Sequence, residues 1–158
     1  MKVSPTMEGG LRIDPESPQD WHALRAIIMD ANNCEKDLAE RMGGLVSDEK
    51  LREDWQDLVV PDLRESFGDA IHYVYASIEA AAAFSGGGDS PLWITREDAT
   101  SWYSALNQAR LSLEEKYQFG PEPEDSPEST SLVRREALMR SQFYCALQSF
   151  ILEHAMTL

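Results

Sequence analysis

The sequence predicts an all-α fold: residues 1–158 form one domain, a bundle of five or six helices, to which a small N-terminal β-hairpin can be added. Three observations favour this class. The length of 158 residues fits one domain. Most of the chain carries apolar residues at the three- and four-residue spacing of a helix. The interruptions are short and rich in Gly and Pro, which is typical of loops between packed helices.

Residues 1–15 contain two short apolar runs, "MKV" and "LRI", separated by "EGG". Gly9 and Gly10 suit the turn of a two-stranded hairpin. A hairpin alone is only marginally stable in water, so this one is expected to pack on the helices.

The first helix begins at "SPQDW", where Ser17 is the N-cap and Pro18 the first helical residue. Apolar residues then follow helical spacing, weaken at "ANNC", and resume at Leu38. Gly43 and Gly44 are a natural stop. The pattern leaves two alternatives, one long kinked helix or two helices that meet near Asn32.

Ser47 is the expected cap of the next helix, which ends near Val59 because Pro61 disfavours helical geometry in the residue before it. Another helix is expected from there to about Phe84. Its predicted apolar face consists of Leu63, Phe67, Ala70, Ile71, Val74 and Ile78. "SGGGDSP", residues 85–91, reads as a flexible connector.

Thr95 and Asp98 resemble a capping box that opens the following helix, which ends near Gly120. Residues 120–130, "GPEPEDSPEST", form an acidic, proline-rich loop. A final helix is expected from about Ser131 to Met156. Its apolar arc is wide: Val133, Ala137, Leu138, Phe143, Tyr144, Leu147, Phe150 and Ile151. Such an arc suits either a central helix or a helix that also forms a homodimer.

The net charge of the chain makes some classes of binding partner unfavourable. There are 28 acidic and 14 basic residues, a formal net charge of -14. Phosphate backbones and anionic membranes attract clustered Lys and Arg, so we expect neither nucleic-acid nor membrane binding. Cys34 and Cys145 are not in a CxxC pair and read as reduced, mostly buried thiols, which favours a cytoplasmic location.

The motifs of the common catalytic classes are missing from the sequence. There is no Gly-x-Ser-x-Gly and no His-Glu-x-x-His. The nearest metal-like pair, Asp69 and His72, is explained by a hydrogen bond between neighbours on a helix. We therefore favour a protein that is not an enzyme, without a cofactor or a metal; an enzyme with a metal held by Asp69 and His72 is the remaining alternative.

The segment "TSWYSALNQARLSLEEKY", residues 100–117, holds the candidate site. Trp102 and Leu106 lie on its apolar face and are predicted structural anchors. Tyr103, Asn107 and Arg110 form an adjacent polar stripe.

Two interpretations of this stripe remain. In the first, Asn107 and Arg110, together with Tyr103 and Arg64, bind a small ligand or an anion. In the second, Asn107 holds a neighbouring loop and Arg110 pairs with a carboxylate from another helix. Asp62, a further structural anchor, and Glu65 are the expected carboxylates.

The segment "TREDATSWYSALNQARLSL" resembles a bacterial family known as the domain of unknown function number twenty-seventeen. "LRIDPES" and "LREDWQDLVVPDLRESF" are similar to it as well. The resemblance implies a small helical cytosolic protein whose gene sometimes lies beside that of the Clp protease adaptor, and therefore a role near proteolysis. It supplies no catalytic residue. Together with the residues, it favours a protein-interaction module that can self-associate through the C-terminal helix; the alternative is ligand binding at Asn107 and Arg110.

Overall fold

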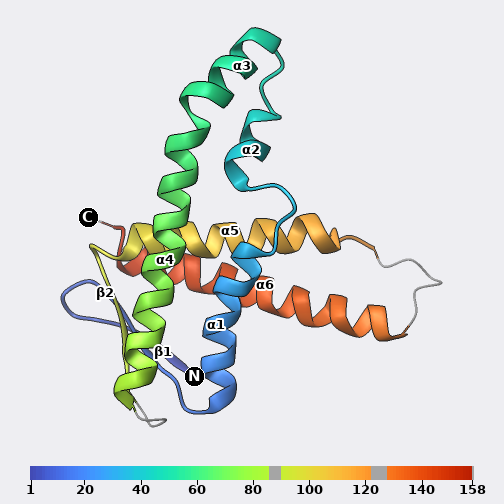
Figure 1. The fold of residues 1–158 in the computed structure, drawn as a ribbon. Coiled ribbons are helices and arrows are strands. Elements are labelled where there is room, and N and C mark those ends of the chain that lie inside the picture. Colours follow the sequence, from blue (N-terminus) through green and yellow to red (C-terminus); the bar gives the residue numbers. More distant parts are fainter. Residues whose placement is uncertain (86–89, 122–127, 158) are drawn as a thin grey trace.

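The computed structural model describes residues 1–85, 90–121 and 128–157 (Figure 1). Six helices make up most of this part of the chain, which is 70% helical, and a small antiparallel sheet lies at the N-terminus. The predicted fold class is confirmed. The predicted connector at 85–91 and the acidic loop at 120–130 fall largely outside the described residues.

The N-terminal hairpin is present and has a third strand beside it. β1 (Lys2–Pro5) pairs antiparallel with β2 (Gly10–Asp14), which pairs antiparallel with β3 (Leu92–Thr95). Gly10 has a φ of +131°, and a Cβ there would lie 2.5 Å from the carbonyl oxygen of Ile94, so glycine is needed at this strand contact.

The sequence interpretation missed β3, because a four-residue strand carries too little alternation to be distinguished from a loop. Leu92 and Ile94 are buried, while Trp93 and Thr95 are exposed. This alternation places one face of β3 on the core.

The helices follow the predicted order. They are α1 (Pro18–Asn32), α2 (Leu38–Gly43), α3 (Glu49–Leu58), α4 (Val60–Ser85), α5 (Ala99–Tyr117) and α6 (Glu128–His154). The alternative of two helices before Gly44 is therefore the correct one.

Of the three helix caps expected from the sequence, Ser17 is confirmed, the Thr95–Asp98 hydrogen bonds form in the turn before α5, whose N-cap is Asp98, and Ser47 is not a cap. Ser17 Oγ accepts a hydrogen bond from Asp20 N at 3.3 Å and caps α1. Thr95 N donates to Asp98 Oδ2 at 2.9 Å and Asp98 N donates to Thr95 Oγ1 at 3.4 Å, the reciprocal pattern of a capping box. The prediction of Ser47 as a cap was wrong: Asp48 caps α3, accepting from Leu51 N at 3.0 Å.

The core is centred on α5, which packs against α1, α4 and α6. Trp102 and Leu106 are fully buried there, as their predicted role as anchors requires. α6 packs on α5 and β2. It therefore lies at one side of the body, and it is not the central helix.

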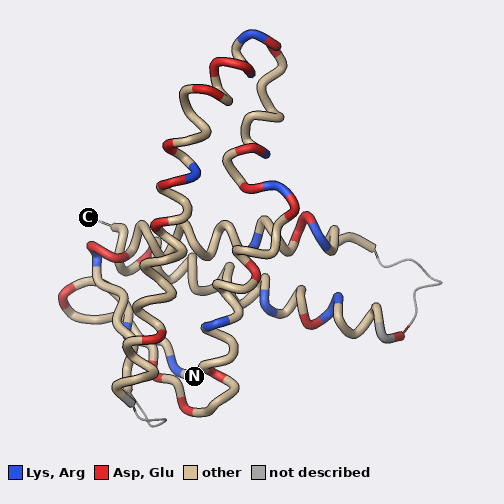
Figure 2. Tube along the Cα trace, in the orientation of Figure 1, with Lys and Arg blue, Asp and Glu red and all other residues tan. Residues whose placement is uncertain are grey.

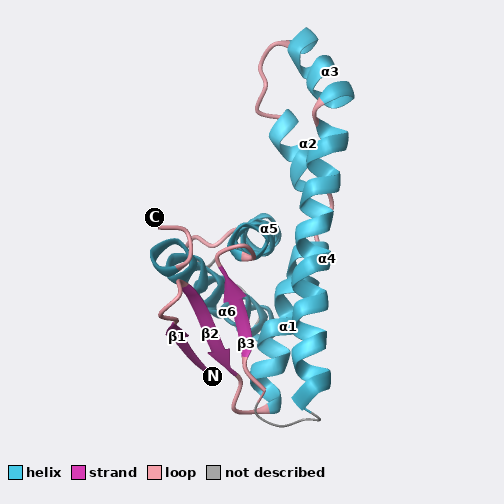
Figure 3. Cartoon of the chain, turned by 90° about the vertical axis from the view of Figure 1, so that its left-hand side faces the viewer, coloured by secondary structure: helices cyan, strands magenta, loops and turns pink. Residues whose placement is uncertain are grey.

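α2, α3 and the N-terminal half of α4 project from this body as an arm (Figures 1 and 3). Acidic residues are frequent along it, as Figure 2 shows. None of the residues of α3, all of which the structure describes, is buried. The arm therefore presents most of its surface to solvent.

The prediction of two mostly buried thiols was wrong for Cys145, which is exposed; Cys34 is half-buried. Cys145 follows the fully buried Tyr144 on α6, and the wide apolar pattern of that helix did not show where its buried side ends. Within the described ranges, none of the helices is both long and apolar enough to cross a lipid bilayer.

Candidate functional site

Two residues of the predicted polar stripe on α5 contact α6. Arg110 Nη1 donates to Gln148 Oε1 on α6 at 2.7 Å, and Gln148 Nε2 donates to the carbonyl of Tyr103 at 3.3 Å. Asp62 and Glu65, the expected partners of Arg110, are instead exposed on α4. That expectation was wrong because the sequence does not show which helix lies against which side of α5.

Arg110 and Gln148 form a partly buried polar contact. Gln148 is 3% exposed, and Arg110 Nε is buried without an acceptor among the described residues. An unpaired buried donor costs free energy. The contact therefore fixes how α5 and α6 face each other, and the half-buried guanidinium of Arg110 is already bound by Gln148.

Gln108 is a buried amide on the side of α5 that faces α4, and the sequence interpretation did not single it out. Its Nε2 donates to the carbonyl of Phe67 on α4 at 3.1 Å and to Ser104 Oγ at 3.4 Å. Asn107 is half-buried and has no side-chain hydrogen bond to any residue in the described ranges. The tethering role expected of Asn107 is thus filled by its neighbour, one helical position away.

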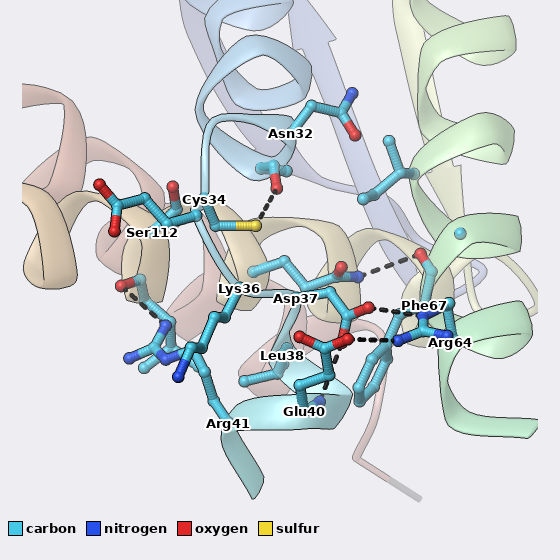
Figure 4. Close-up of a pocket in the computed structure, with 16 residues that line it drawn as sticks. Asn32, Cys34, Lys36, Asp37, Leu38, Glu40, Arg41, Arg64, Phe67 and Ser112 are labelled. Carbon is cyan, nitrogen blue, oxygen red and sulfur yellow. Dashed lines mark hydrogen bonds and ion pairs between the residues drawn. The ribbon is translucent and has the colours of Figure 1, made fainter. Parts of the chain in front are cut away.

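Arg64, the fourth candidate, lies at a cleft between the arm and the body (Figure 4). The cleft has a volume of about 440 Å³. Its walls come from the end of α1, the following loop, α2, α4 and α5. The side chains that matter for its chemistry are Cys34, Lys36, Asp37, Leu38, Glu40, Arg41, Arg64, Phe67, Ile71 and Gln108. Of the predicted site residues, only Arg64 lines this cleft.

The charge of Arg64 is compensated by two carboxylates of the arm. Its Nε lies 2.5 Å from Asp37 Oδ2 and its Nη2 lies 2.8 Å from Glu40 Oε1. Asp37 also caps α2, accepting from Glu40 N at 2.9 Å. Burial raises the pKa of Asp37, but the hydrogen bonds from Glu40 N and Arg64 outweigh it and lower that pKa. Arg64 therefore holds α2 against α4.

Arg41 closes the cleft on the side of α5. Its Nη1 donates to the carbonyl of Leu111 at 3.3 Å and lies 3.5 Å from Glu115 Oε2. Leu38 and Phe67 contribute apolar side chains to the cleft. Arg41 and Arg64 are both bound by other residues of the chain. We therefore interpret the cleft primarily as the place where the arm packs on the body.

Asp69 and His72 are both exposed on α4. Among the residues that the structure describes, no three His, Cys, Asp or Glu side chains lie close enough together to hold a metal ion.

One side of α6 carries apolar side chains that are exposed, apart from Phe143, which packs in part against the core. We call this set the α6 stripe: Leu132, Met139, Phe143, Ala146 and Phe150. These residues recur at intervals of seven, four, three and four positions, which places them on one side of the helix. Leu132, Met139 and Phe150 are 55%, 68% and 40% exposed.

The comparison with protein families is decisive for classification. The model of the family described as Domain of unknown function (DUF2017) matches residues 4–155. The chain belongs to the DUF2017 family. The resemblance seen in "TREDATSWYSALNQARLSL" is confirmed at this level. Searches of curated proteins and of solved structures found no match.

In this DUF2017 chain the segment that carries the resemblance is largely structural. Trp102, Leu106 and Ala109 are fully buried in α5, and Arg110 contacts α6. This part of the chain therefore positions α4 and α6 around α5. Surfaces available for function lie elsewhere, on the α6 stripe and on the arm.

Proposed function

We propose that this DUF2017 chain is a non-enzymatic cytoplasmic protein-interaction module, and that two copies associate through the α6 stripe. The observation that carries the proposal is the stripe itself: five apolar residues along one side of a 27-residue helix, three of them at least 40% exposed. Contiguous exposed apolar surface of this kind is typical of an interaction site.

The charge of α6 favours a second copy as the occupant. The chain as a whole carries -14, so most pairs of surfaces from two copies repel each other. α6 differs, because its three arginines (Arg134, Arg135 and Arg140) equal its three acidic residues (Glu128, Glu136 and Glu153) in number. Two α6 helices can therefore approach with little electrostatic cost.

The spacing of the stripe supports helix-on-helix packing. From Met139 to Phe150 the intervals are four, three and four residues, which are those of a coiled-coil seam. α6 is also held firmly on the body, because Arg140 is anchored to Asp30 of α1. A helix that is already ordered loses little conformational entropy when it binds.

Sedimentation equilibrium over a range of protein concentrations tests the proposal. We expect a monomer–dimer equilibrium for the unmodified chain that strengthens with added salt, since salt screens the repulsion between acidic bodies. The double variant Met139→Glu, Phe150→Glu should be monomeric throughout. The matched control is Met29→Glu on α1, where the side chain is 72% exposed, and it should dimerise normally.

A monomer at every concentration, or an equal loss of dimer in Met29→Glu and the double variant, would contradict self-association through α6. Circular dichroism must show the same helix content in all three proteins, so that unfolding does not imitate dissociation.

Ligand binding at Asn107 and Arg110 is the second candidate. It is supported by the buried Nε of Arg110, which lacks an acceptor among the described residues. A ligand there would have to compete with Gln148 for the guanidinium, which is why we place this function second. The family resemblance extends the first proposal to partners that act in proteolysis.

A further inference from the structure

We propose that the tip of the arm binds a basic amphipathic helix of another protein. The docking surface is an apolar patch on α2, α3 and the turn between them. We call it the arm-tip patch: Met42, Leu45, Leu51, Trp55 and Leu58. The partner and the surface are both distinct from those of the α6 dimer.

The patch is apolar and open to solvent. Leu45, Leu51 and Leu58 are 86%, 59% and 71% exposed, and Met42 is 36% exposed. Leu51, Trp55 and Leu58 are four and three positions apart on α3, so they share one side of that helix. This is the spacing with which helices bind in apolar grooves.

Trp55 joins the two short helices of the tip. A Cβ at Gly43 of α2 would lie 3.0 Å from Trp55 Cδ1, so the indole packs directly on the glycine backbone. The indole Nε1 of Trp55 is buried without an acceptor among the described residues. The contact gives the patch a fixed aromatic centre, and such aromatic residues often carry much of the binding energy at interfaces.

The tip obtains little stability from its own packing. α3 has ten residues, and an isolated helix of that length is marginal in water. Its N-terminus is capped by Asp48, and Arg52 donates to the carbonyl of Val46 at 2.8 and 3.0 Å. A partner that covers the patch would therefore stabilise α3 as well as bury its leucines.

The charges around the patch select the chemistry of the partner. Within 48–58 there are five acidic residues, Asp48, Glu49, Glu53, Asp54 and Asp57, and two basic ones, Lys50 and Arg52. Arg52 is already engaged by the carbonyl of Val46. Asp54 lies beside the apolar face, because it is three positions after Leu51 and four before Leu58, whereas Glu53 lies on the opposite side of α3. An apolar patch on an acidic helix is complementary to a helix with leucines on one face and Lys or Arg on the other. A second arm tip would instead bring like charges together.

The test uses the full chain and a synthetic helical peptide of about 18 residues, with Leu along one face and Lys on the other. Isothermal titration calorimetry gives the affinity, and amide chemical shifts from NMR give the site. We expect the largest shifts within residues 42–58 and a Kd that rises at least about tenfold in the double variant Leu51→Ser, Leu58→Ser. Both side chains are exposed, so the variant should keep its fold, which circular dichroism checks.

Two further variants separate charge from apolar contact. Asp54→Lys should weaken binding of the peptide as well, because Asp54 lies beside the leucines, and added salt should weaken binding to the unmodified chain. Phe84→Ser, on a side chain that is 89% exposed at the far end of α4, is the matched control and should bind normally. A scrambled peptide of the same composition should bind at least about tenfold more weakly.

Equal binding of the scrambled peptide, equal affinity in the leucine variant, or shifts centred on α6 would overturn the proposal. So would loss of dimer in the Leu51→Ser, Leu58→Ser variant, because the occupant of the patch would then be a second copy. Sedimentation of the α6 variants is independent of the peptide titration, so the two proposals can fail separately.

Discussion

Asp30 on α1 accepts two hydrogen bonds from Arg140 on α6, which lies 110 residues further along the chain. The distances are 2.8 Å from Nε and 3.2 Å from Nη2. The hydroxyl of Tyr144 donates to the same carboxylate at 2.7 Å. Asp30 is only 7% exposed, so this carboxylate is satisfied almost entirely by α6. The contact joins the first helix of the body to the last.

Replacing Asp30 should destabilise the fold more than most single substitutions. Asp30→Ala leaves the partly buried Arg140 without its carboxylate and Tyr144 without an acceptor. We expect a loss of about 2 to 4 kcal/mol in the free energy of unfolding, measured with urea. Glu136→Ala on the exposed side of α6 should change it by less than about 0.5 kcal/mol. A loss as small as that for Asp30→Ala would show that the contact contributes little.

Tyr144 should make the stability fall at alkaline pH. Burial, and next the hydrogen bond to Asp30, raise the pKa of Tyr144 far above its ordinary value. Its contribution is fully present below the unfolded pKa of about 10. It decreases as the pH rises further, because the unfolded chain then loses a proton that the folded chain keeps.

The comparison with Tyr144→Phe isolates this effect. Between pH 9 and pH 11 the unmodified chain should lose about 1 kcal/mol more stability than the variant, as measured by urea unfolding at each pH. A difference between the two proteins that stays constant over this range would contradict the raised pKa.

Arg110→Ala separates the two interpretations of the α5 stripe. If Arg110 mainly joins α5 to α6, the substitution should lower the free energy of unfolding by about 1 to 3 kcal/mol, because Gln148 loses its partner in the interior. Binding of the basic peptide should be unchanged. Asn107→Ala is the neighbouring control and should cost less than Arg110→Ala. An unchanged stability together with altered ligand binding would instead favour a binding role.

The two thiols should differ in reactivity. Cys145 is exposed, whereas Cys34 is half-buried, with its Sγ 3.9 Å from the carbonyl oxygen of Ala31. Under native conditions a thiol reagent should modify one cysteine rapidly and the other slowly, and Cys145→Ser should remove the rapid phase. Two phases that persist in Cys145→Ser would contradict the exposure of this side chain.

Local signals in the sequence predicted most of the elements. Ser17 and the Thr95–Asp98 pair marked helix starts, Gly43 and Pro61 marked breaks, and the hairpin followed from glycines that need unusual backbone angles. Each of these features depends on residues within a few positions of one another. The short strand β3 was missed, since it exists only through its pairing with β2.

The candidate site could be predicted only in part. Arg64 was singled out and does line a cleft, but its partners Asp37 and Glu40 come from a different helix. Gln108 could have been suspected, because a polar side chain beside the apolar face of α5 needs a partner when it is buried. The sequence did not show which of the two neighbouring amides, Asn107 or Gln108, would be the buried one.

By itself, the sequence determined the helical class, the helix order, the acidic charge and the resemblance to the family, because periodicity, caps and composition are properties of neighbouring residues. Tertiary structure alone decided that Arg110 meets Gln148, that Arg140 meets Asp30, and that Cys145 and the α6 stripe face solvent. These outcomes depend on how helices far apart in the chain are rotated and packed. A repeat of 3.6 residues per turn shows which residues share a face, but not which neighbour that face will meet.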